Sequence, residues 1–139
     1  MGDVKAFWVA GKAVSQGDVA HVHNPANGQV VGSHFVPSAA QVEQAVAAAY
    51  GVRRELQATT IAARAEALMH ISRRISDRAE ELAVLITSEN GKPITLARSE
   101  VSRAVATFRW AAEEVRHFSG EMQRLDTEPA AAGRLGIIR

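Results

Sequence analysis

Residues 90–118 read NGKPITLARSEVSRAVATFRWAAEEVRHF, and this stretch decides the predicted fold. Its Gly91 suits the left-handed position that ends a helix, and Pro93 suits the first turn of the next helix. After this proline, apolar residues recur at helical spacing, with charged residues on the other faces. The stretch therefore predicts two helices, over 78–90 and 93–119, joined by a tight turn.

Two further helices are predicted upstream of this turn. Ser38, followed three residues later by a glutamine, forms a capping box, and apolar residues then recur at helical spacing over 39–57. Thr59 or Thr60 caps a second helix over 60–76. We expect no strand from the start of this helix to the end of the fourth.

The predicted core is thin. Apolar residues make up 47% of the 139 residues, but many of them are alanine, which buries little area. Aromatic residues make up only 5%, so we expect helix-on-helix packing. The residues expected to face inward are Leu68, Ile75, Leu85, Val105 and Phe108.

Residues 7–36 predict two or three short strands, because turn residues separate short apolar runs. Asn27-Gly28 is the strongest hairpin signal, since both residues tolerate a positive φ. A two-residue turn there places His21 opposite His34, with His23 on the same side of the pleat as His21. Such a cluster could hold a transition metal, and the alternative is a solvated, polar sheet face.

Charge and composition exclude several classes of function. The chain has 16 basic and 15 acidic residues, and its net charge of +1 gives no support to nucleic-acid binding. No stretch approaches the roughly 20 apolar residues of a membrane span, and the first residues lack a signal-peptide layout. There is no cysteine, which excludes disulfides and thiolate chemistry in these residues. We expect a cytoplasmic protein.

Several motifs, in order, resemble those of one family. Residues 24–32, NPANGQVVG, resemble an N-P-A-T-G-E-V-I-G hairpin, and residues 38–49, SAAQVEQAVAAA, resemble the helix after it. Residues 89–93, ENGKP, are similar to an E-T-G-K-P turn, and residues 108–111, FRWA, to the aromatic segment that follows. Residues 7–12, FWVAGK, resemble an opening hairpin, with alanine where glycine is usual. The family is the NAD(P)-dependent aldehyde dehydrogenases.

The resemblance implies a fold and a reaction. The segment would be mostly α with a short N-terminal β-hairpin region, an α+β arrangement on its own and part of an α/β dinucleotide-binding domain in the parent. The family oxidises an aldehyde to a carboxylic acid by cysteine attack, hydride transfer to NAD or NADP, and thioester hydrolysis. The family's catalytic and cofactor-binding residues have no counterpart here. We therefore expect an N-terminal segment that is inactive alone and binds no dinucleotide.

The resemblance also implies one candidate site. Some family members hold a monovalent cation with an acidic side chain early in the helix after G-K-P and with carbonyls just before N-P. The corresponding groups here are the Glu100 side chain and the carbonyls of Val22 and His23. The alternative is that Glu100 is an ordinary surface residue paired with Arg103.

Three segments are expected within one incomplete domain: N-terminal β-hairpins (1–36), a helical segment (37–120), and a connector with the start of a strand (121–139). The apolar strand end has no obvious partner in the chain. We therefore expect it to associate with the remainder of the same polypeptide, or with another copy through residues 134–139, to form a homo-oligomer.

A second hypothesis is a free-standing helical module that binds other proteins and has no enzymatic activity. In that case the long apolar stripe of the fourth helix is a partner-binding surface rather than part of a core. The two hypotheses share the same predicted helices and differ only in what covers them.

Overall fold

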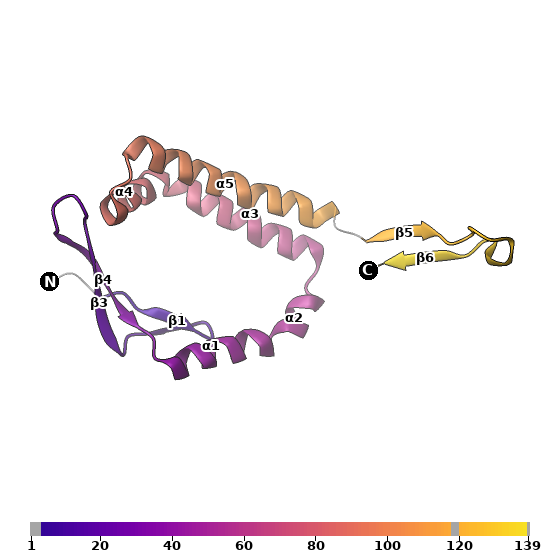
Figure 1. Cartoon of the computed structure of the whole chain (residues 1–139), viewed down its shortest axis with the longest axis horizontal. Coiled ribbons are helices and arrows are strands. Elements are labelled where there is room, and N and C mark those ends of the chain that lie inside the picture. Colours follow the sequence, from indigo (N-terminus) through magenta and orange to yellow (C-terminus); the bar gives the residue numbers. More distant parts are fainter. Residues whose placement is uncertain (1–3, 118–119, 139) are drawn as a thin grey trace.

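The structure, a computed structural model, describes residues 4–117 and 120–138. Figure 1 shows N-terminal strands, a helical region and a hairpin that projects from it. In chain order the elements are β1 (Phe7–Val9), β2 (Lys12–Val14), β3 (Asp18–His23), β4 (Val30–Val36), α1 (Ala39–Gly51), α2 (Arg53–Ala58), α3 (Ile61–Asp77), α4 (Ala79–Asn90), α5 (Ile94–His117), β5 (Glu121–Arg124), the 3-10 turn η1 (Pro129–Ala131) and β6 (Leu135–Ile138). The mostly helical fold with short strand pairs is the predicted one.

The N-terminal strands form two separate antiparallel pairs, β1–β2 and β3–β4, so the described residues of this region contain four strands rather than two or three. In the first pair, Ala10 and Gly11 make the turn with φ values of 50° and 75°. Two successive positive φ values are typical of a tight hairpin turn that matches the twist of its strands.

The loop between β3 and β4 is longer than the predicted two-residue turn. The Asn24 amide donates to the Gln29 carbonyl at 2.8 Å, so the loop extends from one of these residues to the other. Pro25 has no N–H with which to extend the ladder, and the Asn24 side chain accepts from the Ala26 amide at 2.9 Å. These features end the pairing three residues before the Asn-Gly step.

The predicted histidine register is therefore wrong. His21 lies opposite Ser33, and His34 lies opposite Ala20. Because successive residues of a strand point to opposite faces, His34 is on the other face of the sheet from His21. The longer loop, together with a β-bulge between Val22 and His23, shifts the pairing of His21 by one residue, which is enough to separate the two side chains.

The predicted helix over 39–57 is two helices, α1 and α2. Val52, with φ −86° and ψ 0°, separates them. The predicted caps are present, because the Ser38 side chain accepts from the Gln41 amide and the Thr60 side chain accepts from the Ala63 amide. The break follows Gly51, a residue that weakens a helix locally.

The core lies between α3, α4 and α5 and is as thin as predicted. Among the described residues, no large side chain is fully buried. The buried residues of this region are Ala65, Ser72, Ala83, Ala97, Val101 and Ala112. Ser72 Oγ donates to the Val105 carbonyl at 2.8 Å and so joins α3 to α5. Small side chains let two helices approach closely, and α3 and α5 run side by side in Figure 1.

Four of the five residues expected to face inward are half-buried: Leu68, Ile75, Val105 and Phe108. The prediction for Leu85 is wrong, because its side chain is 43% exposed. Ala83 takes the inward position on α4 and packs against Ala97 and Val101. Side chains two residues apart on a helix point in directions that differ by about 200° around its axis, so Ala83 and Leu85 cannot both face the core. The predicted end of α5, at residues 118–119, lies outside the described residues.

The C-terminal strand has a partner within the chain, contrary to the prediction. β6 pairs with β5 in antiparallel register, with Met122 opposite Ile137 and Arg124 opposite Leu135. The turn η1 and Gly133, at φ 77°, reverse the chain between the two strands. Figure 1 shows the β5–β6 hairpin extending away from the helices.

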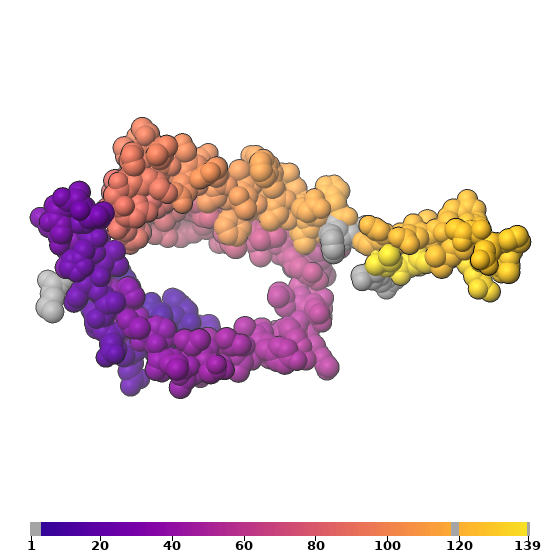
Figure 2. Space-filling view, in the orientation of Figure 1, coloured from indigo at the N-terminus to yellow at the C-terminus, as the bar shows by residue number. Residues whose placement is uncertain are grey.

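The helices and the N-terminal strands surround an open space. Figure 2 shows an open space between the side formed by α1 and α2 and the side formed by α3 and α5. The α1 helix packs on β1 and contacts α2, whereas α3 packs mainly on α5. The N-terminal elements and the three-helix layer are thus joined at their ends rather than along their faces.

Candidate functional site

Glu100, the predicted cation ligand, lies near the start of α5 in a shallow groove lined also by Lys92, Leu96, Ser99 and Arg103. The Lys92 ammonium donates to Glu100 Oε2 in a partly exposed ion pair. This hydrogen bond and the Lys92 charge, with a smaller contribution from Arg103, hold the pKa of Glu100 below its usual value. The carboxylate is therefore ionised at neutral pH, and its partner is Lys92 rather than Arg103.

Val22 and His23, which carry the predicted carbonyl ligands, lie at the end of β3. The loop that follows them contacts the turn between α4 and α5, because a Cβ added at Gly91 would lie 2.9 Å from the Pro25 ring. Gly91 also has a φ of 74°, so it ends α4 as predicted. The hairpin tip therefore lies against the turn that leads to Lys92, which is the partner of Glu100.

The three-histidine metal cluster is not formed. Within residues 4–117 and 120–138, no group of three or more His, Cys, Asp or Glu side chains is placed to hold a metal ion. His21 and His23 do lie close together, with ring centroids 6.4 Å apart, while His34 is on the opposite face.

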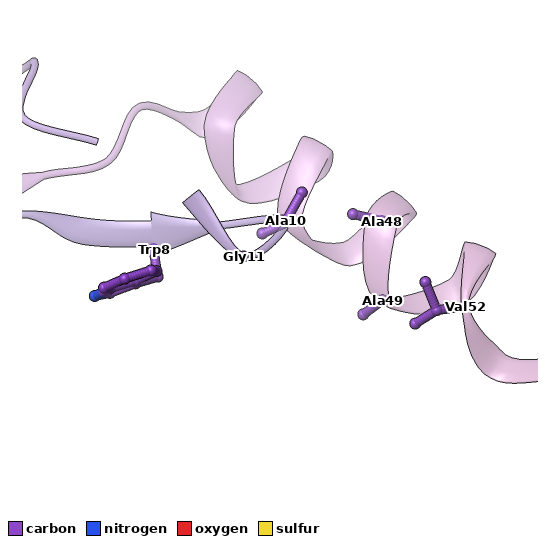
Figure 3. Close-up of a pocket in the computed structure, with 7 residues that line it drawn as sticks. Trp8, Ala10, Gly11, Ala48, Ala49 and Val52 are labelled. Carbon is purple, nitrogen blue, oxygen red and sulfur yellow. The ribbon is translucent and has the colours of Figure 1, made fainter. Parts of the chain in front are cut away.

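An apolar hollow of about 450 Å³ lies between the β1–β2 turn and α1. Its lining residues are Trp8, Ala10, Gly11, Ala45, Ala48, Ala49 and Val52. Figure 3 shows the Trp8 ring beneath the hairpin, the Ala48 and Ala49 side chains on α1, and Val52 just after the end of that helix. The lining carries no titratable side chain, so it offers apolar contact and no catalytic group. This hollow was not predicted from the sequence, because the Phe7-Trp8-Val9 run does not show that Trp8 is exposed and Val9 is buried.

The described helices include none that combines the length and the apolar character needed to cross a membrane. The chain also contains no cysteine, so it offers no thiol nucleophile.

Comparisons with known proteins identify the family. Residues 8–137 match the aldehyde dehydrogenase family. The 3,6-anhydro-alpha-L-galactose dehydrogenase of Streptomyces coelicolor is 36% identical over 141 residues, covering 99% of this chain and 27% of that protein. The chain belongs to the aldehyde dehydrogenase family.

Solved structures agree with this assignment. Aldehyde dehydrogenase 21 from Physcomitrella patens superposes with a TM-score of 0.89 at 30% identity, covering 96% of this chain and 28% of that one. An NAD-dependent aldehyde dehydrogenase from Sinorhizobium meliloti superposes with a TM-score of 0.85 at 29% identity, covering 99% of this chain and 28% of that one. The chain thus spans about a quarter of the length of the relatives that it matches.

Proposed function

We propose that the chain is the N-terminal scaffolding segment of an NAD(P)+-dependent aldehyde dehydrogenase that oxidises an aldehyde to a carboxylic acid. The observation that carries the proposal is the family match along nearly all of this chain but only about a quarter of each relative. A segment of that length is a part of the enzyme's fold rather than the whole of it.

In this proposal the chain contributes structure, with α3, α4 and α5 forming the helical flank of a dinucleotide-binding domain. A thiol attack on the aldehyde has to come from a longer polypeptide, because these 139 residues contain no cysteine. When bound to that polypeptide, NAD or NADP supplies the hydride acceptor. No residue of this chain is assigned a role in cofactor binding.

Exposed apolar side chains support an interface with the remainder of such a polypeptide. On the α1–α2 side, Val46, Tyr50 and Leu56 are 61%, 65% and 60% exposed. On α5, Leu96 and Trp110 are 58% and 62% exposed. Side chains of this size lose unfavourable contact with water when another chain or domain covers them.

A segment exchange tests the proposal. Residues 8–137 replace the matching segment of the Sinorhizobium meliloti enzyme, and a mock graft of that enzyme's own segment is the control. We expect the chimaera to fold and to form NADH in the presence of an aldehyde. A folded chimaera without activity would contradict a purely scaffolding role, as would aldehyde-dependent NADH formation by the isolated chain.

We also propose a monovalent cation site formed by the Glu100 carboxylate and the Val22 and His23 carbonyls. Two observations support it: the carboxylate is ionised, and the hairpin tip reaches the α4–α5 turn. Oxygen ligands suit hard cations, but the Lys92 ammonium competes for the same carboxylate.

A cation effect on stability tests this site. We expect the melting temperature to be higher in KCl than in choline chloride at the same ionic strength, and Glu100→Gln to remove the difference. Glu113→Gln, on the same helix, serves as the control. An equal difference in both variants would contradict the site.

We further propose that the protein is a homo-oligomer and is cytoplasmic. The β5–β6 hairpin supports association, because its strands pair only with each other among the described residues and its apolar side chains are exposed. The lack of cysteine is compatible with a reducing compartment, and fractionation of cells that make the tagged protein checks the location.

A further inference from the structure

We propose that His21 and His23 form a two-histidine site for a divalent transition-metal ion of the Cu²⁺, Ni²⁺ and Zn²⁺ class. The two residues lie two positions apart on β3, which places their side chains on one face of the β3–β4 sheet. Both residues are exposed, and their ring centroids are 6.4 Å apart with the planes at 84°. The proposal does not depend on the proposed enzyme function.

Hydrogen bonds fix the ring nitrogen that remains for a metal. His23 Nδ1 lies 3.1 Å from the Gly28 carbonyl oxygen, which can only accept, so Nδ1 carries the proton in the neutral ring. Its Nε2 then presents a lone pair. Such a hydrogen bond from the second nitrogen is the usual way in which proteins orient a metal-binding histidine.

His21 is held in the same way from the neighbouring strand. Its Nδ1 lies 2.8 Å from Ser33 Oγ, and Ser33 is the residue directly opposite it on β4. A serine hydroxyl can accept a hydrogen bond from Nδ1–H, and in that tautomer Nε2 of His21 is available as well. Two rings on one face therefore present the same nitrogen atom, each held by a separate partner.

The distance between the His21 and His23 rings allows both to bind one ion. Metal–imidazole bonds are about 2.0–2.1 Å long, so rings that share an ion lie within a few ångströms of each other. Both side chains are exposed, so the rings can adjust to an ion without disturbing a packed core. Imidazole nitrogens favour Cu²⁺, Ni²⁺ and Zn²⁺ over Ca²⁺ and Mg²⁺, with Cu²⁺ bound most tightly.

Two ligands leave other coordination positions to water or to a small chelator. A Cu²⁺–iminodiacetate complex is therefore a suitable probe, because the chelator occupies some positions and leaves room for a pair of imidazoles. The matched control is His34→Gln, since His34 is on the same hairpin but on the opposite face. The test variants are His21→Gln and His23→Gln, and all three changes are at exposed positions.

The experiment is a calorimetric titration of the 139-residue chain with this complex, with electron paramagnetic resonance to count nitrogen ligands. We expect one complex per chain and two imidazole nitrogens on copper. Either test variant should weaken binding by at least tenfold, His34→Gln should leave it unchanged, and Ser33→Ala should weaken it roughly tenfold through loss of the second-nitrogen partner.

Circular dichroism of each variant checks that the fold is retained. Equal affinity in the chain and in His21→Gln or His23→Gln would overturn the proposal, and so would an equal loss in His34→Gln. A spectrum with one imidazole nitrogen would also overturn it, because it would show a single histidine acting alone.

Discussion

Ala10 holds a backbone conformation that suits glycine better. Its φ of 50° is the only positive value at a non-glycine residue among those that the structure describes. A Cβ in this region is close to the following carbonyl oxygen, at a cost of roughly 1–2 kcal/mol. The sequence comparison with the family's opening hairpin already indicated glycine at this position.

We expect Ala10→Gly to stabilise the chain by about 0.5–1 kcal/mol, because the relief of strain exceeds the entropy that glycine loses on folding. Urea unfolding measures the change. Ala10→Val is the paired control and should destabilise, since a β-branched side chain is strained further at positive φ. A lower unfolding midpoint for the glycine variant would contradict this account of the turn.

At the scale of elements, the fit of α4 against α5 depends on small side chains. Ala97 is completely buried beside Ala83, so a larger residue has no space there. We expect Ala97→Leu to destabilise the chain by about 1–3 kcal/mol through overpacking. The neighbouring Leu96→Ala, at a position 58% exposed, should change stability by less than about 0.5 kcal/mol. Similar unfolding midpoints for the two variants would show that this interface is loose.

The same two helices are joined by an exposed ion pair. Arg98 donates to both oxygens of Glu80, at 2.9 Å and 2.7 Å, and the hydrogen bond lowers the pKa of Glu80 from its ordinary value of 4.5. A lowered folded-state pKa stabilises the fold above the unfolded value, and this stability is lost as the pH falls through the folded one.

The melting temperature should therefore fall as the pH decreases below about 4.5. Glu81 and Glu100, whose pKa values are also lowered by basic partners, contribute in the same direction. Arg98→Met should reduce the fall without abolishing it, and thermal melts at a series of pH values measure both. An identical pH profile in the variant would show that the pair has no effect, as for many exposed pairs.

Helices with clear caps were predictable, whereas registers and breaks were not. The Ser38 capping box and the left-handed Gly91 are local signals, so their helix boundaries agree with the structure. The β3–β4 register depends on the loop length and on a β-bulge between Val22 and His23, neither of which the Asn-Gly signal contains. Leu85 was misplaced because helical spacing alone does not choose between neighbouring faces. At the candidate site, helical spacing predicted that Glu100 pairs with Arg103, three residues further along the same helix. The observed partner, Lys92, lies before the start of α5, so helical spacing could not predict it.

At the scale of the whole molecule, the β5–β6 hairpin is the element with least cover. Met122 and Ile137, which lie opposite each other, are 70% and 68% exposed. We expect the chain to form a dimer or a larger species, with light scattering giving a mass above 14.9 kDa. Ile137→Lys should lower the mass toward that of a single chain. Val84→Lys, at an exposed position on α4, should not.

A mass of 14.9 kDa at high concentration would contradict association by the unmodified chain. A mass unchanged by Ile137→Lys would place the contact elsewhere.

The contact of Pro25 with Gly91 has a consequence for the order of folding. It joins the β3–β4 hairpin to the turn between α4 and α5, two regions that are distant in sequence. Closing so long a loop costs entropy before any contact compensates for it, so local helices and hairpins form first and this contact forms late. Pro25→Ala should consequently speed unfolding in stopped-flow measurements while leaving the folding rate almost unchanged. A slower folding rate would instead make loop closure part of the nucleus.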